Sequence, residues 1–118
     1  MIKYKNPIPP ILQLLNRYGV TCYGNKFPND ADYPSVVIRT AGGNGYSRLQ
    51  LIARSENSDI EAMDILTEAI NVLEMKTAQI ESLMVLWCEK NSNPVAYFDS
   101  VTGKEEAWCY MTLEHLEA

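Results

Sequence analysis

Apolar residues recur at helical spacing in two stretches of the chain. The first stretch follows a proline-rich start and stops before Gly19, an arrangement typical of helix ends, so a short amphipathic helix is predicted over 8–18. The second follows Ser58, a residue suited to N-capping, and predicts a helix over 59–74. Its apolar positions are Ile60, Met63, Leu66, Ile70 and Leu73. The opposite side carries the acidic residues Glu61, Asp64 and Glu68. Such a stripe is typical of a solvated helix face rather than of a cation site.

β-Branched and alternating residues predict the strands. Ser35–Thr40 and Tyr46–Ala53 form one predicted hairpin, because a glycine-rich segment joins them. A further strand is expected at Leu83–Cys88. A second hairpin, with a plain turn at Asp99–Gly103, is expected from Val95–Phe98 and Glu106–Leu113. Two neighbouring segments are compatible with a short strand and a loop, namely Val20–Tyr23 and Gly24–Pro34.

The order of these elements defines the fold class. Helix, strands, helix, strands, with hairpins dominating, predicts one α+β domain over 1–118. We expect a mainly antiparallel sheet of four to five strands with two helices packed on one face.

The alternation within the strands also predicts which side chains point away from the helices. These are Val37, Arg39, Arg48, Ile52, Arg54, Trp108 and Tyr110. Arginine together with Trp and Tyr is the composition enriched in hot spots of protein interfaces. We therefore expect a self-association interface at Arg39, Arg48, Arg54, Trp108 and Tyr110. The alternative is a solvated face on which arginines merely cover aromatic rings.

The tip of the first hairpin contains Gly42, Gly43, Asn44 and Gly45. A phosphate-binding loop would carry a lysine and lead into a helix, whereas this segment joins two strands. A poorly ordered hairpin tip is expected instead. Such a tip is also suited to contact with a partner.

Composition excludes several classes of function. The chain has 118 residues, 47% of them hydrophobic, which is enough for one domain with a buried core. A net charge of −5 disfavours binding to nucleic acid through its phosphates. No apolar stretch approaches the roughly 20 residues of a membrane span. Met1–Pro10 lacks the apolar run of a signal peptide, so synthesis in the cytoplasm is expected.

Few residues suit catalysis or metal binding. His115 is the single histidine, and the chain has no CxxC pair, so we expect no catalytic, cofactor-binding or metal-binding residues. Cys88 is placed with Leu86 on an apolar strand face, and Cys109 also alternates with apolar neighbours. We therefore expect buried, unreactive thiols rather than disulfides. The three cysteines are Cys22, Cys88 and Cys109.

Several features together resemble a known family. In chain order they are the proline-rich start before a short helix, YPSVVIRT at Tyr33–Thr40, the glycine loop, LIAR at Leu51–Arg54, the acidic-faced helix, and a late hairpin with Pro94, Asp99, Thr102, Gly103 and Trp108. In this order they resemble the tail-terminator and minor capsid (tail-completion) proteins of long-tailed, double-stranded DNA bacteriophages. The resemblance covers most of the chain as an order of elements.

The resemblance implies a structural role without catalytic residues or cofactors. Members of the family are small α+β proteins that assemble into homo-oligomeric rings, typically hexamers. The ring caps the last layer of the tail tube, stops its polymerisation and presents a surface to the head connector. The implied location is the virion tail, with tail-tube and connector proteins as partners and neither membrane nor sequence-specific nucleic acid among them. The alternative is a small non-enzymatic protein-binding module that acts as a monomer or dimer.

Overall fold

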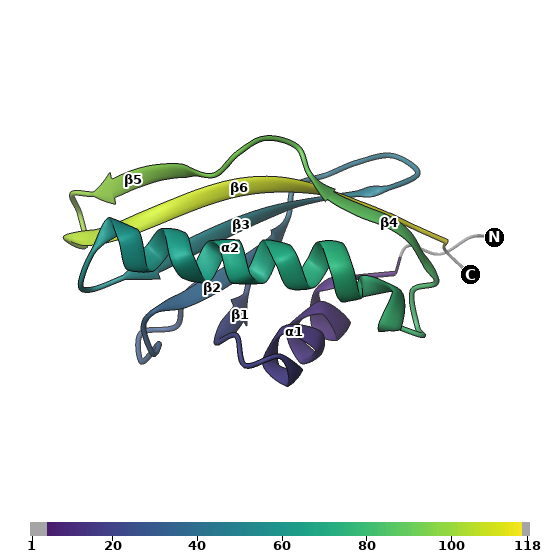
Figure 1. Cartoon of the computed structure of the whole chain (residues 1–118), viewed down its shortest axis with the longest axis horizontal. Coiled ribbons are helices and arrows are strands. Elements are labelled where there is room, and N and C mark those ends of the chain that lie inside the picture. The colour runs from purple at the N-terminus through teal and green to yellow at the C-terminus, as the bar shows by residue number, and fades with distance from the viewer. Residues whose placement is uncertain (1–4, 117–118) are drawn as a thin grey trace.

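A computed structural model describes residues 5–116 and shows two helices packed on one face of a six-stranded sheet (Figure 1). The α+β class and the single-sided helical layer are confirmed. The helices are α1 (Ile8–Arg17) and α2 (Asp59–Lys76), the latter followed by a short 3-10 turn, η1 (Thr77–Gln79). The strands are β1 (Cys22–Gly24), β2 (Ser35–Thr40), β3 (Ser47–Ser55), β4 (Val85–Lys90), β5 (Val95–Asp99) and β6 (Lys104–His115).

The sheet is built around the long strand β6. The strand order is β1-β2-β3-β6-β4, and β5 pairs with the beginning of β6, on the same edge as β4. Every pairing is antiparallel except β1 with β2. The sheet has six strands rather than the expected four to five, because the three residues of β1 pair in parallel with β2 and extend that edge. Both predicted hairpins are present.

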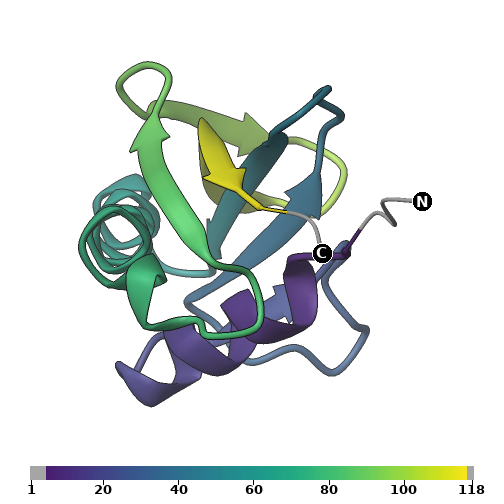
Figure 2. The ribbon, with the colours of Figure 1, turned by 90° about the vertical axis from the view of Figure 1, so that its right-hand side faces the viewer.

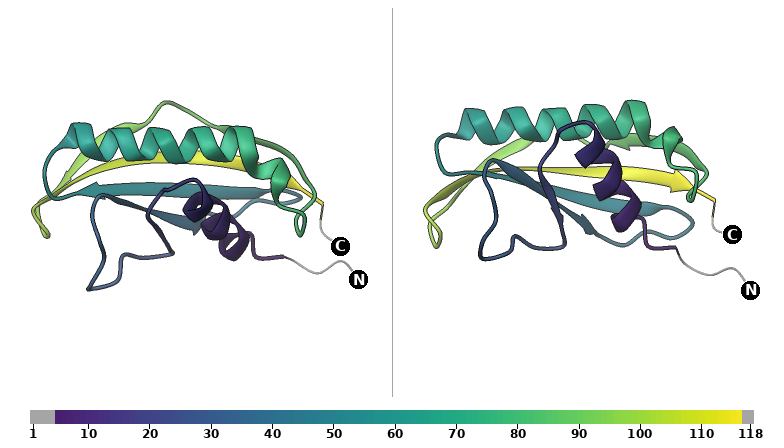
Figure 3. Two further views of the ribbon diagram at one scale, coloured as in Figure 1. Left: turned by 60° about the horizontal axis from the view of Figure 1, so that its bottom comes forward. Right: turned by 90° about the horizontal axis from the view of Figure 1, so that it is seen from below.

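Local sequence explains where the helices begin and end. Prolines occupy the first turn of α1, and Gly19 follows its end with a φ of +81°, a conformation that favours glycine. The side chain of Ser58 accepts a hydrogen bond of 3.1 Å from the backbone N–H of Glu61, which caps α2 as predicted. Figures 2 and 3 show α2 lying along the sheet while α1 crosses at a steep angle.

The apolar side of α2 differs from the prediction at its start. Ile60 is 68% exposed, because it lies on the side of the helix that faces away from the sheet. Two alanines, Ala62 and Ala69, instead belong to the buried stripe, where their small side chains allow close approach to the strands. The buried stripe of α2 consists of Ala62, Ile65, Leu66, Ala69, Ile70 and Leu73.

The core lies between the helices and the inner face of the sheet. Burial alternates residue by residue along all nine residues of β3, as expected for a strand with one face on the core. The strands contribute to this core Val36, Ile38, Leu49, Leu51, Ala53, Cys88, Ala107, Cys109, Met111 and Leu113.

Cys88 is buried as expected, but the reason given for its burial is wrong. Strict alternation would place it on the same face as Leu86, which is 65% exposed. A register shift on β4 between Val85 and Trp87 inserts one residue, so Val85 and Cys88 face the core while Leu86 does not.

Candidate functional site

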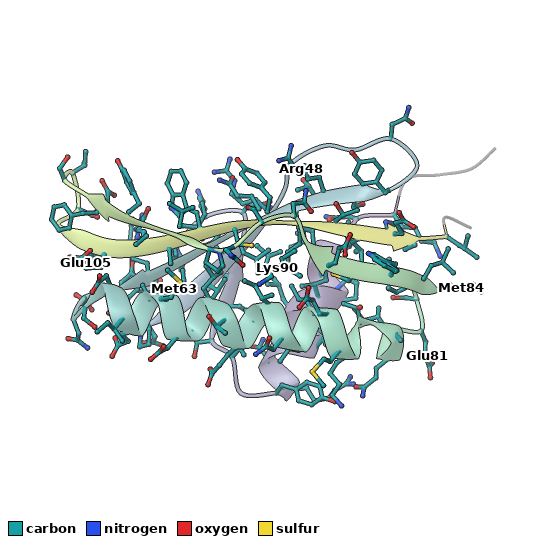
Figure 4. The ribbon with its side chains drawn as sticks, turned by 45° about the horizontal axis from the view of Figure 1, so that its top comes forward. Arg48, Met63, Glu81, Met84, Lys90 and Glu105 are labelled. Carbon is teal, nitrogen blue, oxygen red and sulfur yellow. The ribbon has the colours of Figure 1, made fainter. Side chains whose placement is uncertain are left out.

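The structure brings the five expected interface residues to one face of the sheet. We call the face opposite the helices the outer face. On β3 and β6, Ile52 lies across from Trp108, and Gln50 lies across from Tyr110. Arg48 and Arg54 alternate with the buried residues of β3 and therefore share this face. Figure 4 shows the Arg48 side chain on the side of the sheet away from α2, with aromatic rings standing above β5 and β6.

A groove of about 480 Å³ opens on the outer face. Its lining includes Val37 and Ile52, and Val37 is only 1% exposed although it lies on the outer face. The loop after β1, residues 25–34, contains Phe27 and forms one side of the groove, while Tyr97 of β5 contributes to the other. The groove is lined by Asn25, Lys26, Phe27, Val37, Arg39, Ile52, Arg54, Tyr97, Asp99, Glu106 and Trp108.

Arg54 is bound within its own chain. Its Nε and Nη2 donate hydrogen bonds of 2.8 and 2.6 Å to Oε2 of Glu106, and its Nη2 lies 3.7 Å from a carboxylate oxygen of Asp99. The guanidinium lies 4.3 Å from the centre of the Phe27 ring. Glu106 is only 3% exposed, and its other oxygen accepts a hydrogen bond of 2.9 Å from the Trp108 indole. Arg54 of β3 therefore links β6, β5 and the loop after β1 through its contacts with Glu106, Asp99 and Phe27.

The charge state of Arg54 follows from these contacts. Burial alone would lower the pKa of its guanidinium, but the hydrogen bonds to Glu106 and the neighbouring Tyr33 outweigh burial and raise the pKa above its ordinary value. The side chain stays a cation whose charge Glu106 balances. It does not offer a free positive charge to a partner.

The other two arginines differ from Arg54. Arg39 is exposed and has no ion pair with any residue in 5–116. Arg48 lies over the Tyr110 ring, 4.3 Å from its centre, as the alternative of arginines covering aromatic rings requires. Trp108 lies 5.0 Å from the ring centre of Tyr97, at a tilted angle. The outer face thus presents one free arginine beside an aromatic cluster.

The glycine tip joins β2 and β3 through a β-bulge. Ala41 donates its N–H to the carbonyl of Arg48 (2.6 Å), and Arg48 donates its N–H to the carbonyl of Gly42 (2.8 Å), so two residues oppose one. Gly43 has a φ of +117°, and a Cβ there would overlap the carbonyl oxygen of Tyr46. Backbone geometry therefore requires glycine at this position, and all four residues of the tip are exposed.

The thiols and the histidine are buried. All three cysteines are free. Burial raises the pKa of Cys22 to about 11 and that of Cys88 to about 12, with Glu74 and Glu89 adding to the effect on Cys88. His115 is 6% exposed, and its Nε2 lies 3.0 Å from the hydroxyl of Ser47.

Between residues 5 and 116, no group of three or more His, Cys, Asp or Glu side chains is arranged to hold a metal ion. No helix in this part of the chain is long and apolar enough to cross a membrane. The acidic turn after β5 is satisfied locally, since Asp99 accepts hydrogen bonds from Val101 and Thr102.

Sequence reasoning missed several residues of the groove. Phe27 lies in a segment with the composition of an irregular loop. Its aromatic side chain was the one sequence signal that this loop contacts the sheet, where Phe27 meets Arg54. Tyr97 lies two residues before Asp99 on β5. Alternation along this strand would have been enough to place Tyr97 on the outer face. Glu106 stands two residues before Trp108, and an acidic residue at that spacing was a usable signal of a partner for Arg54.

No protein-family profile matches the chain, and no curated protein shows significant sequence similarity to it.

Proposed function

We propose that this chain is a structural virion protein that caps a phage tail tube as an oligomeric ring and joins it to the head connector. The observation that supports assembly is the outer face, which neither α1 nor α2 covers. There, Arg39, Trp108 and Tyr110 lie together beside a groove. The family resemblance of the sequence supplies the specific assembly, the phage tail.

The exposed aromatic area supports contact with another protein surface. Tyr97 is 47% exposed, Trp108 36% and the neighbouring Val95 64%. Aromatic and arginine side chains placed together are the residues whose burial contributes most to protein association. Large contiguous apolar patches are uncommon on proteins that remain monomeric. Self-association would remove this surface from water.

A second candidate is a small binding module that acts as a monomer or dimer. The groove favours it, since its volume of about 480 Å³ lies within the range of pockets that bury a small ligand, and a single protruding side chain of a partner protein is of that size or smaller. The two candidates differ in the mass of the assembled protein. A ring requires several copies, whereas the module does not.

Light scattering of the purified chain and of Arg39→Glu separates the candidates. We expect the parent to form an assembly of several copies and Arg39→Glu to dissociate with its melting temperature nearly unchanged, because Arg39 has no ion pair within residues 5–116. Arg17→Glu is the matched control, since Arg17 is also exposed but lies on α1, away from the outer face. A monomeric or dimeric parent would favour the binding module, and equal masses for parent and Arg39→Glu would exclude this face from the interface.

A further inference from the structure

Helix α2 and the groove on the outer face differ in the sign of their charge. Helix α2 contains five carboxylates and one lysine, a formal charge of −4 against −5 for the whole chain. The groove on the outer face has three cations, Lys26, Arg39 and Arg54, and two carboxylates, a formal charge of +1. Arg54 is paired with both carboxylates, so the cations left free are Lys26 and Arg39. Within residues 5–116, the only side-chain ion pairs are those of Arg54 with Glu106 and Asp99. Opposite charges are therefore left without partners on different faces.

These two faces cannot neutralise each other within one copy. Asp64 and Glu68 are exposed on α2, where they line a hollow with Thr21, Asp32 and Tyr33 whose lining within residues 5–116 includes no cationic side chain. The groove opens on the other side of the same sheet, and Figure 4 shows α2 and the outer-face side chains on opposite sides of it. Contact between them requires a second molecule.

Apolar side chains accompany the charges on both faces. Ile60 and Met75, near the two ends of α2, are 68% and 73% exposed. Tyr97 and Trp108 of the outer face are also exposed. At about 1.5 Å per residue, the 18 residues of α2 extend for about 27 Å, against 45 Å for the longest dimension of the molecule. The helix thus offers an acidic ridge with apolar ends, and the outer face offers a cationic and aromatic groove.

We propose that the solvent-facing side of α2 in one copy docks on the outer face of the next copy. This inference rests on the proposed self-assembling function and names the two surfaces that meet. Lys26 and Arg39 would lie against Asp64 and Glu68 of the neighbouring copy. Because two different surfaces meet, the contact is head-to-tail, and repeated head-to-tail contacts close into a ring when the rotation between copies allows it.

Exchanging the charges tests which surfaces meet. The sheet variant carries Lys26→Glu and Arg39→Glu, and the helix variant carries Asp64→Lys and Glu68→Lys. All four side chains are exposed, and none takes part in a side-chain hydrogen bond or ion pair with residues 5–116. Each variant alone brings like charges together, so we expect its self-association to weaken about 100-fold or more. Circular dichroism confirms that each variant is folded.

Mixing the two variants in equal amounts gives the decisive measurement. In a head-to-tail assembly the copies alternate, every contact again joins opposite charges, and the mass returns to that of the parent. A chain that carries all four substitutions should also assemble. A helix variant that assembles like the parent, or a mixture that stays dissociated, would overturn the head-to-tail contact while leaving a ring through other surfaces in place. A parent that is monomeric both in solution and on tail tubes would overturn the ring function as well.

Discussion

Replacing Arg54 by alanine tests whether this arginine stabilises the fold rather than forming an interface. The change leaves the Glu106 carboxylate, 3% exposed, with the Trp108 indole as its one remaining side-chain donor among residues 5–116. Removing one partner of a buried ion pair costs about 3–5 kcal/mol. Because the Arg54 side chain keeps 17% exposure, water screens part of the interaction, and we expect a loss of about 2–4 kcal/mol.

Urea denaturation monitored by circular dichroism measures this loss in the free energy of unfolding. In a separate thermal denaturation, the melting temperature of a domain of this size should fall by roughly 6–20 °C. Arg39→Ala is the matched control on the neighbouring strand, and we expect a change within about 0.5 kcal/mol, because this arginine is exposed and has no ion pair within residues 5–116.

The double variant Arg54→Ala, Glu106→Ala completes a mutant cycle. It leaves no unpaired buried carboxylate, so its loss should be smaller than the sum of the two single losses by about 1 kcal/mol or more. Additive losses, or an Arg54→Ala protein as stable as Arg39→Ala, would refute a structural role for the pair.

Four other measurements test the buried cysteines and the glycine tip. The three cysteines should react with a thiol reagent only after denaturation, and fast labelling of the native protein would contradict their burial. Because burial raises the pKa of Cys22 from 9.0 to about 11, the unfolded chain releases its thiol proton first, so the free energy of unfolding should fall as the pH rises above 9.0. Gly43→Ala should destabilise by about 1–3 kcal/mol and by more than Gly45→Ala, which meets no neighbouring atom, and equal melting temperatures would contradict the steric overlap. Shortening 42–45 to an Asn-Gly turn should leave thermal stability unchanged or higher yet abolish complementation of a phage that lacks this gene, and normal tails in electron micrographs would show that the tip is only a connection.

The parts of the fold that depend on periodic patterns could be predicted from the sequence. The helices and both hairpins follow from apolar spacing and from turn residues near their ends, such as Ser58 and Gly19. The outer face could also be assigned, because alternation continues without interruption along β3. Alternation fails on strand β4, because the bulge there moves Leu86 to the exposed side. The residues of β4 include no glycine or proline that would have predicted this bulge.

Contacts between distant segments could not be derived from local patterns. Arg54 and Glu106 are 52 residues apart and meet only because of the register between β3 and β6. Phe27 reaches Arg54 because its loop folds back over the sheet. Both contacts change the role of Arg54, which composition alone grouped with Arg39. Arg54 stabilises the fold because it is paired with Glu106, whereas Arg39 has no ion pair within residues 5–116.

The most direct test of the proposed function uses tail tubes assembled without this protein. Purified protein is added to them, and electron microscopy records where it binds and whether the tubes lengthen when more tube subunit is supplied. We predict a ring at one end of each tube and no further growth from that end. Tubes that continue to lengthen at both ends, with protein bound along their sides or not at all, would contradict a tail-capping role.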